Sequence, residues 1–235
     1  MRGGGSVSLH PLQQGLQDIY ALNVAHNVDN FLLTNRQLAG QLGGAAALRS
    51  VRESLLVHED RGELNLSLYL DPGVVEALDP GRPARDLEGV GLDDFCLALE
   101  GVSHFLYLVW YASHNRSVTL LEMELQAEID KFVMLRGVFA GAAGGSANGA
   151  MQRLFQDAIF HADLGNEELA RYQDASRLAE RYCRGLERRF FRGGSRVELL
   201  RELRGFYRLS RSDKLHQIKR LDRPAPRGRE GCGAG

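Results

Sequence analysis

The sequence predicts a mainly α-helical fold, a multi-helix bundle with one inserted β-hairpin. Most segments between residues 11 and 221 repeat apolar residues at intervals of three and four, the spacing of an amphipathic helix. The segment at about 54–70 instead alternates apolar and polar residues around the turn-like stretch Glu59–Glu63. The two patterns together predict α structure with minor β.

The helices are expected in a fixed order along the chain. Asp71 followed by Pro72 indicates a helix start, because Asp caps and Pro suits the first turn. Ser195 and Glu198 have the spacing of a capping box. The expected helices are 11–22, 27–42, 72–78, a central helix capped by Asp93 or Asp94 that ends near 114–115, 118–140 capped by Ser117, 150–163, 166–192, 196–209 and 211–221.

The chain is expected to form one helical domain over residues 11–221. Residues 1–10 are rich in Gly and Ser, and residues 222–235 are rich in Pro, Gly and Arg, so both ends are expected to be disordered. The Gly-rich segment 141–149 is expected to be a flexible linker. It has no Lys-Ser/Thr after it and no strand before it, so it matches no phosphate-binding loop.

The composition is that of an ordinary globular protein, with 44% hydrophobic and 25% charged residues. Cys96, Cys183 and Cys232 have no paired spacing, which predicts free thiols in a reducing compartment. The start lacks a secretory signal, and the apolar run 105–112 is too short to cross a bilayer. We therefore expect a cytoplasmic protein without a membrane partner, and the abundance of Arg, Ala and Gly suggests a GC-rich bacterial genome.

A polar stripe runs through the most apolar helix of the chain. Glu100, His104, Tyr107 and Tyr111 stand at positions i, i+4, i+7 and i+11, which places them on one helix face. Buried carboxylates and imidazoles are costly without partners. The connection 113–116 is short, so the next helix should pack antiparallel and bring Glu128 or Glu122 toward the stripe. We expect one hydrogen-bonded cluster of Glu100, His104 and Glu128.

The stripe has two interpretations. It is either a satisfied polar network inside the core or a catalytic or metal site, with Glu100, His104, Tyr107, Tyr111 and Glu128 as candidate residues. The Glu-x-x-His pairs of di-iron bundles are absent, and no metal-binding or cofactor-binding motif occurs, so no metal ligand or cofactor is assigned. His161 and Asp163 form a weaker candidate pair.

Positive charge is concentrated in the C-terminal part. Residues 171–235 hold 18 Lys and Arg against 8 Asp and Glu, and the preceding residues hold 11 against 22. Interleaved bases and aromatics suit polyanion binding. The candidates for such binding are Arg188, Arg189, Arg192, Arg204 and Arg208. The alternative is that solvated arginines pair with acids of the chain, as the i,i+4 spacing of Glu180 and Arg184 suggests.

Three functions follow from these features. The leading hypothesis is a non-enzymatic interaction or accessory module, with a protein partner or self-association through the basic helices or the hairpin edge. The first alternative is a metal-dependent or acid/base enzyme built on the polar stripe. The second is nucleic-acid or polyanion binding, which ranks below a protein partner. The sequence resembles no family that would decide among them.

Overall fold

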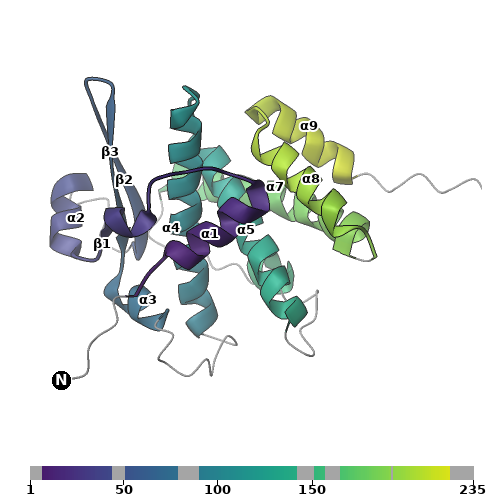
Figure 1. Cartoon of the computed structure of the whole chain (residues 1–235), viewed down its shortest axis with the longest axis horizontal. Coiled ribbons are helices and arrows are strands. Elements are labelled where there is room, and N and C mark those ends of the chain that lie inside the picture. Colours follow the sequence, from purple (N-terminus) through teal and green to yellow (C-terminus); the bar gives the residue numbers. More distant parts are fainter. Residues whose placement is uncertain are drawn as a thin grey trace, which may run out of the picture.

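The computed structural model describes residues 7–43, 51–78, 90–141, 151–156, 165–191 and 193–222. It confirms the predicted fold class, because the chain is mainly helical with a small three-stranded sheet at one side (Figure 1). The expected linker 141–149 and both expected disordered ends fall mainly outside the described residues.

The elements of the N-terminal half include the sheet. They are α1 (His10–Tyr20), the 3-10 helix η1 (Val28–Phe31), β1 (Leu32–Leu33), α2 (Arg36–Gly43), β2 (Glu53–Asp60), β3 (Glu63–Leu70) and α3 (Pro72–Ala77). The described elements of the second half are helical. They are α4 (Val90–Ser113), α5 (Leu120–Gly141), the π-helical η2 (Gln152–Gln156), α7 (Asn166–Leu186), the π-helical η3 (Glu187–Phe191), α8 (Arg196–Tyr207) and α9 (Arg211–Asp222).

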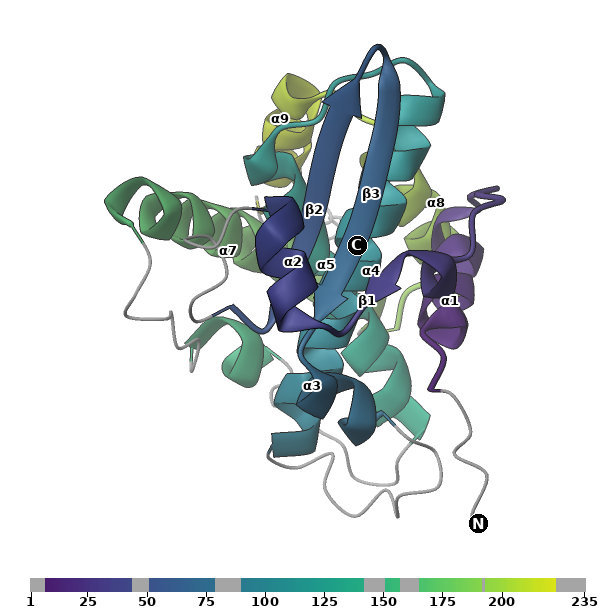
Figure 2. The same ribbon diagram turned by 90° about the vertical axis from the view of Figure 1, so that its left-hand side faces the viewer.

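The predicted hairpin is confirmed in position. β2 and β3 pair antiparallel from Glu53 opposite Leu70 to Asp60 opposite Glu63. Arg61 and Gly62 both have positive φ, at 51° and 82°, as a two-residue hairpin turn of type I′ requires. Figure 2 shows the hairpin in front of α4 and α5, with α2 on its outer face. The hairpin therefore lies on the helical body, as its leucine-rich face requires.

The prediction of one helix over 27–42 was wrong. Residues 28–31 form η1, β1 pairs parallel with β3, and α2 begins only at Arg36. Two asparagines explain the break. The Asn27 side chain accepts from the Asp29 N–H, and the Asn35 side chain accepts from the Leu38 N–H. Such local bonds give the backbone an alternative to a continuous helix.

The predicted helix caps are partly confirmed. Asp71 accepts from the Gly73 N–H, and Ser195 accepts from the Val197 N–H. Ser117, however, is not the cap of α5. Thr119 caps it instead, with its hydroxyl accepting from the Glu122 N–H while the Glu122 carboxylate accepts from the Thr119 N–H. This reciprocal pair is a capping box, so Glu122 serves the helix end.

The central helix α4 carries much of the core. In the described part of the chain, one helix, Gly91–Ser113, is long and apolar enough to cross a membrane, with a mean hydropathy of 1.3. In the protein, 61% of that apolar window is buried. A buried core helix passes the same test of length and composition, so this is weak evidence for a membrane span.

The C-terminal helices close the other side of the molecule. α7 packs on both α5 and α9, while α8 packs on α1 (Figure 1). α7 and α9 approach closely at Gly185, where an added Cβ would lie 2.8 Å from the Leu221 Cβ and 3.0 Å from its carbonyl oxygen. Together with the sheet, these helices enclose two buried polar clusters, one on each side of α5.

Candidate functional site: a buried carboxylate and histidine cluster

The first cluster lies where β2 crosses the middle of α4. Six side chains from three elements meet there, and they are Glu53 of β2, Glu100 and His104 of α4, and Glu124, Glu128 and Lys131 of α5. Helix α5 returns along α4 after a short connection, as predicted. Glu100 and His104, one turn apart on α4, therefore face Glu124 and Glu128, one turn apart on α5.

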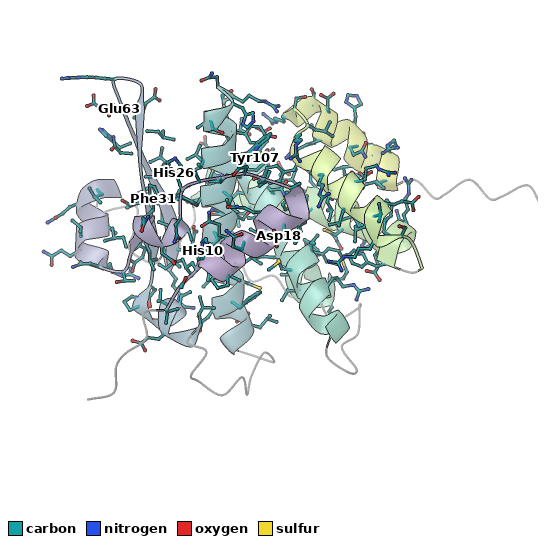
Figure 3. The ribbon with its side chains drawn as sticks, in the orientation of Figure 1. His10, Asp18, His26, Phe31, Glu63 and Tyr107 are labelled. Atoms are coloured by element: carbon teal, nitrogen blue, oxygen red, sulfur yellow. The ribbon has the colours of Figure 1, made fainter. Side chains whose placement is uncertain are left out.

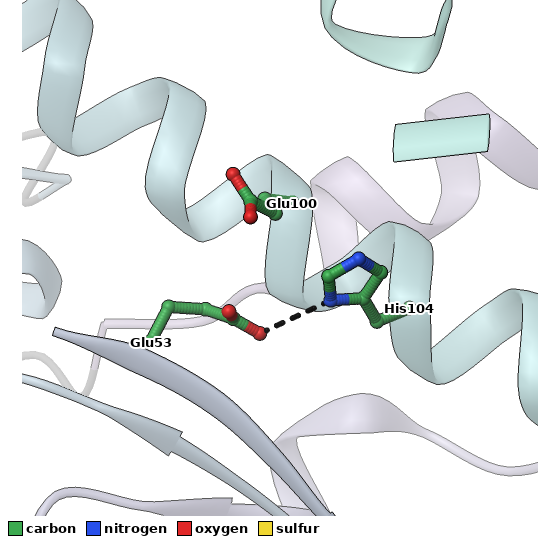
Figure 4. A group of neighbouring side chains, drawn as sticks. All are labelled: Glu53, Glu100 and His104. Atoms are coloured by element: carbon green, nitrogen blue, oxygen red, sulfur yellow. Dashed lines mark ion pairs between the residues drawn. The ribbon is translucent and has the colours of Figure 1, made fainter. Parts of the chain in front are cut away.

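His104 lies between two carboxylates. Its Nδ1 is 3.4 Å from Glu53 Oε1 (Figure 4). Its Nε2 is 3.4 Å from Glu124 Oε2. The three side chains are at most 9% exposed. Burial opposes the imidazolium charge, yet the carboxylates of Glu124 and Glu53 raise the pKa of His104 well above its ordinary value. His104 is therefore held in its charged form.

Two polar atoms of this group lack a hydrogen-bond partner among the described residues. They are Glu53 Oε1 and His104 Nε2, both of which are fully buried. Each lies at ion-pair distance from an opposite charge, but the angles are unsuitable for a hydrogen bond. Buried polar atoms are rarely left without a partner. Glu53 Oε1 thus keeps unused acceptor capacity inside the cluster, whereas Nε2–H of the charged imidazole lies beside Glu124.

Lys131 joins the other two carboxylates. Its Nζ donates to Glu100 Oε2 at 3.0 Å and to Glu128 Oε1 at 2.6 Å. Burial opposes the ammonium charge, but Glu100 and Glu128 raise the pKa of Lys131 well above its ordinary value. The expected meeting of Glu100 and Glu128 therefore occurs through a lysine, and His104 meets Glu53 and Glu124 rather than Glu128.

The cluster holds more negative than positive charge. Its four carboxylates outnumber His104 and Lys131 by two, which leaves a formal charge of −2 with both bases protonated. Burial raises the pKa of Glu53 and that of Glu128 above the usual carboxyl range. The excess charge must be relieved by a proton or by a cation.

A glycine lets the hairpin reach α4 at this point. A Cβ added at Gly101 would lie 2.8 Å from Leu68 Cδ1 and 3.2 Å from Glu53 Cγ. The missing side chain allows β2 to bring Glu53 within reach of His104. Tyr172 of α7 also lies near the cluster, since its pKa is raised by burial and by the charges of Glu124, Glu100 and Glu53.

Three of these side chains have the arrangement of metal ligands. One ligand atom from each of Glu53, Glu100 and His104 lies within 4.8 Å of the other two (Figure 4). Carboxylate oxygens with one imidazole suit Mn²⁺, Fe²⁺ or Zn²⁺. Cys96 is nearby, but burial raises the pKa of its thiol to about 12, so it stays a neutral thiol.

The tyrosines of the predicted stripe belong to the second cluster. The Tyr107 hydroxyl accepts from Lys214 Nζ at 2.8 Å, and the Tyr111 hydroxyl donates to the Tyr207 carbonyl at 2.6 Å. Their rings pack against each other with centroids 4.4 Å apart, and Tyr107 lies on the side of α4 toward α1 and α8 (Figure 3). The stripe therefore divides into Glu100 and His104 at one site and two core tyrosines at another.

Four of the five candidate polyanion-binding arginines bind helix ends. Arg204 donates to the carbonyls of Asp18 and Ile19, and Arg208 to those of Tyr20 and Ala21. These carbonyls end α1 and have no partner within the helix. Arg188 and Arg189 likewise donate to carbonyls at the end of α9. Arg192, His161 and Asp163 lie outside the described residues.

We expect Arg208→Ala to lower the free energy of unfolding by about 1–3 kcal/mol, because two terminal carbonyls of α1 lose a charged donor. Arg177→Ala is the matched control. The Arg177 side chain is 72% exposed and pairs with Asp174, so its loss should change the stability by less than about 0.5 kcal/mol. Urea denaturation of both variants measures the difference, and equal stabilities would refute the capping role.

Other surface charges pair locally. Arg184 pairs with Glu180 at 2.6 Å as predicted. Arg171 pairs with Glu168 of the same helix, and Arg220 pairs with Glu202. At the opposite end of the molecule, Val57 and Leu64 near the hairpin tip are 50% and 39% exposed. Val197 on the basic helix α8 is 65% exposed, so both surfaces expected to contact a partner carry exposed apolar side chains.

Comparisons with protein-family models, curated proteins and solved structures found no match. The site must therefore be interpreted from its own geometry. Glu53, Glu124 and Lys131 were not predicted from sequence. Glu53 begins a strand 47 positions before Glu100, and only the packing of the hairpin on α4 brings it to His104.

Proposed function

We propose that this protein is a metal-dependent enzyme that holds one divalent transition-metal ion through Glu53, Glu100 and His104. The observation that carries the proposal is the convergence of one ligand atom from each of Glu53, Glu100 and His104 within 4.8 Å, at a place where the buried Glu53 Oε1 has no hydrogen-bond partner among the described residues. With His104 neutral, as metal coordination requires, the four carboxylates and Lys131 carry a formal charge of −3, which favours a divalent cation. A metal-free ion network would leave Glu53 Oε1 without a hydrogen bond and would need a proton to relieve its excess negative charge.

The ligand set indicates the chemistry. Two carboxylates and one imidazole favour Mn²⁺, Fe²⁺ or Zn²⁺. Three protein ligands leave coordination positions for water or substrate, as catalytic zinc sites do. An ion held in this way acts as a Lewis acid and lowers the pKa of bound water, which supports hydrolysis. Glu124 would position the imidazole of His104, as carboxylates behind metal-bound histidines do.

This function ranks above the interaction module and the polyanion binder. The arginines that would contact a polyanion donate to carbonyls at the ends of α1 and α9. The hairpin tip offers exposed apolar side chains, but its described residues hold no cluster of unpartnered polar atoms. The buried cluster at α4 is thus the feature that packing alone explains least well and that metal binding explains best.

Metal titration tests the proposal. Chelator-treated wild-type protein should bind about one equivalent of Mn²⁺ or Zn²⁺ by calorimetry, and affinity should rise with pH because His104 must lose its proton. Glu53→Gln should weaken binding by at least about tenfold, since substitutions next to a metal cost that much even in the outer shell. Glu59→Gln, an exposed site on the same strand, should bind as wild type. Absence of binding by folded wild-type protein would overturn the proposal.

A further inference from the structure

The ammonium group of Lys131 lies where a second metal ion could bind beside the proposed metal site. Its Nζ lies 3.0 Å from Glu100 Oε2 and 2.6 Å from Glu128 Oε1, and its side chain is 9% exposed. Lysines are rarely buried to this degree unless they are paired. Here the pairing is with two carboxylates from facing helices, the kind of donors that hold metal ions in helical bundles.

Glu100 links this position to the metal ligands. Its carboxylate belongs both to the ligand group with Glu53 and His104 and to the ion pair with Lys131. In sites that hold two metal ions, the ions lie about 3.5–4 Å apart and share carboxylates between them. Glu100 has the place of such a shared carboxylate, because it belongs to the ligand group and also contacts the Lys131 ammonium.

The charges of the cluster also favour a second cation position at Lys131. With Lys131 and a neutral, metal-bound His104, the four carboxylates leave a formal charge of −3, which one divalent ion reduces to −1. Without Lys131, the charge becomes −4, which two divalent ions balance, and Glu128 loses the cation that lowers its pKa against the effect of burial. The vacated position would then have carboxylate oxygens of Glu100 and Glu128 and no compensating charge.

We propose that Lys131 is an internal cation that fills the second position of a two-cation carboxylate site and so limits the protein to one metal ion. This inference rests on the proposed function, because it requires the first ion at Glu53, Glu100 and His104. Lys131 is a specificity-determining residue in this scheme, since its ammonium group decides how many ions the four carboxylates hold.

The test is the stoichiometry of Mn²⁺ binding to chelator-treated protein, measured by calorimetry and by electron paramagnetic resonance. Wild type should bind one ion and give the signal of an isolated Mn²⁺. Lys131→Met removes the charge but keeps an unbranched side chain, and it should bind two ions whose signals are coupled. Lys131→Arg keeps a cation and should bind one.

A double variant checks where the added ion lies. Glu128→Gln combined with Lys131→Met removes a proposed ligand of the second ion and should return the stoichiometry to one. If Lys131→Met does not fold without metal, Mn²⁺ should restore its helical circular dichroism with two ions bound, and failure to do so would overturn the inference.

The outcomes separate this inference from the proposed function. One ion in both wild type and Lys131→Met would refute the role of Lys131 while leaving the metal site intact. No ion in folded wild type would refute the metal site itself, and with it the inference.

Discussion

Replacing His104 with alanine is expected to lower the free energy of unfolding by about 3–5 kcal/mol, the loss typical of breaking a buried ion pair. The imidazole lies 3.4 Å from both Glu53 and Glu124, and all three side chains are at most 9% exposed. Its removal leaves two carboxylates buried without their cation. Urea denaturation of chelator-treated protein at pH 6 measures the effect on the ion network alone.

The effect of His104 should also depend on pH. The neighbouring carboxylates raise its pKa in the folded protein above the value of about 6.5 in the unfolded chain. The stabilisation from the charged imidazole is therefore complete below about pH 6.5 and is lost as the pH rises through the folded pKa. The difference between wild type and His104→Ala should shrink accordingly. The control is His58→Ala, at an exposed hairpin position, which should change the free energy of unfolding little. An equally small change for His104→Ala would contradict the ion network.

Local patterns predicted the elements that depend on neighbouring residues. The alternation over 54–70 specifies a hairpin because the side-chain period of a strand is two, and Gly62 supplies the positive φ that the turn needs. The segment 27–42 has helical spacing as well, yet Asn27 and Asn35 divide it by capping. Strand β1 then pairs with β3, a contact between distant residues that no local pattern contains.

The sequence predicted the part of the site that lies on a single helix, but not the contacts made by other elements. The spacing of Glu100 and His104 shows that they share a face, and the short connection after α4 correctly brings α5 against it. The same face continues to Tyr107 and Tyr111, but α4 contacts the hairpin and α5 at one level and α8 and α9 at another. The stripe therefore serves two clusters. The packing of α5 along α4 decides that Glu124 rather than Glu128 lies beside His104.

The arginines show why charge alone misleads. A basic segment with interleaved aromatics looks the same in sequence whether its guanidinium groups face solvent or helix ends. Arg204 and Arg208 donate to the last carbonyls of α1, which lies more than 180 positions away in the chain. Only the docking of α8 on α1 reveals these acceptors. Composition determines the number of positive charges but not their partners.

Replacing Lys214 with methionine should make the protein more stable at pH 6 and flatten its stability between pH 7 and 10. Lys214 Nζ is buried among the rings of Tyr107, Phe206 and Tyr207 and donates to the Tyr107 hydroxyl. Burial lowers its pKa to about 7, although Glu122 and Asp130 oppose the shift. Replacing a buried charge by an apolar side chain of similar volume is often neutral or stabilising.

The direction of the pH effect follows from the two states of Lys214. Its pKa is about 7 in the folded protein, against the ordinary lysine value of 10.5 that applies to the unfolded chain, so between these values the unfolded chain binds more protons. Stability from this group therefore rises with pH across that interval, by an amount on the order of 5 kcal/mol. Lys219→Met, at an exposed site on the same helix, should keep the wild-type slope. Chemical denaturation of the three proteins at pH 6, 8 and 9.5 measures these slopes. Parallel curves for wild type and Lys214→Met would show that Lys214 keeps its ordinary pKa, and that α9 does not bury an amine that is neutral at high pH.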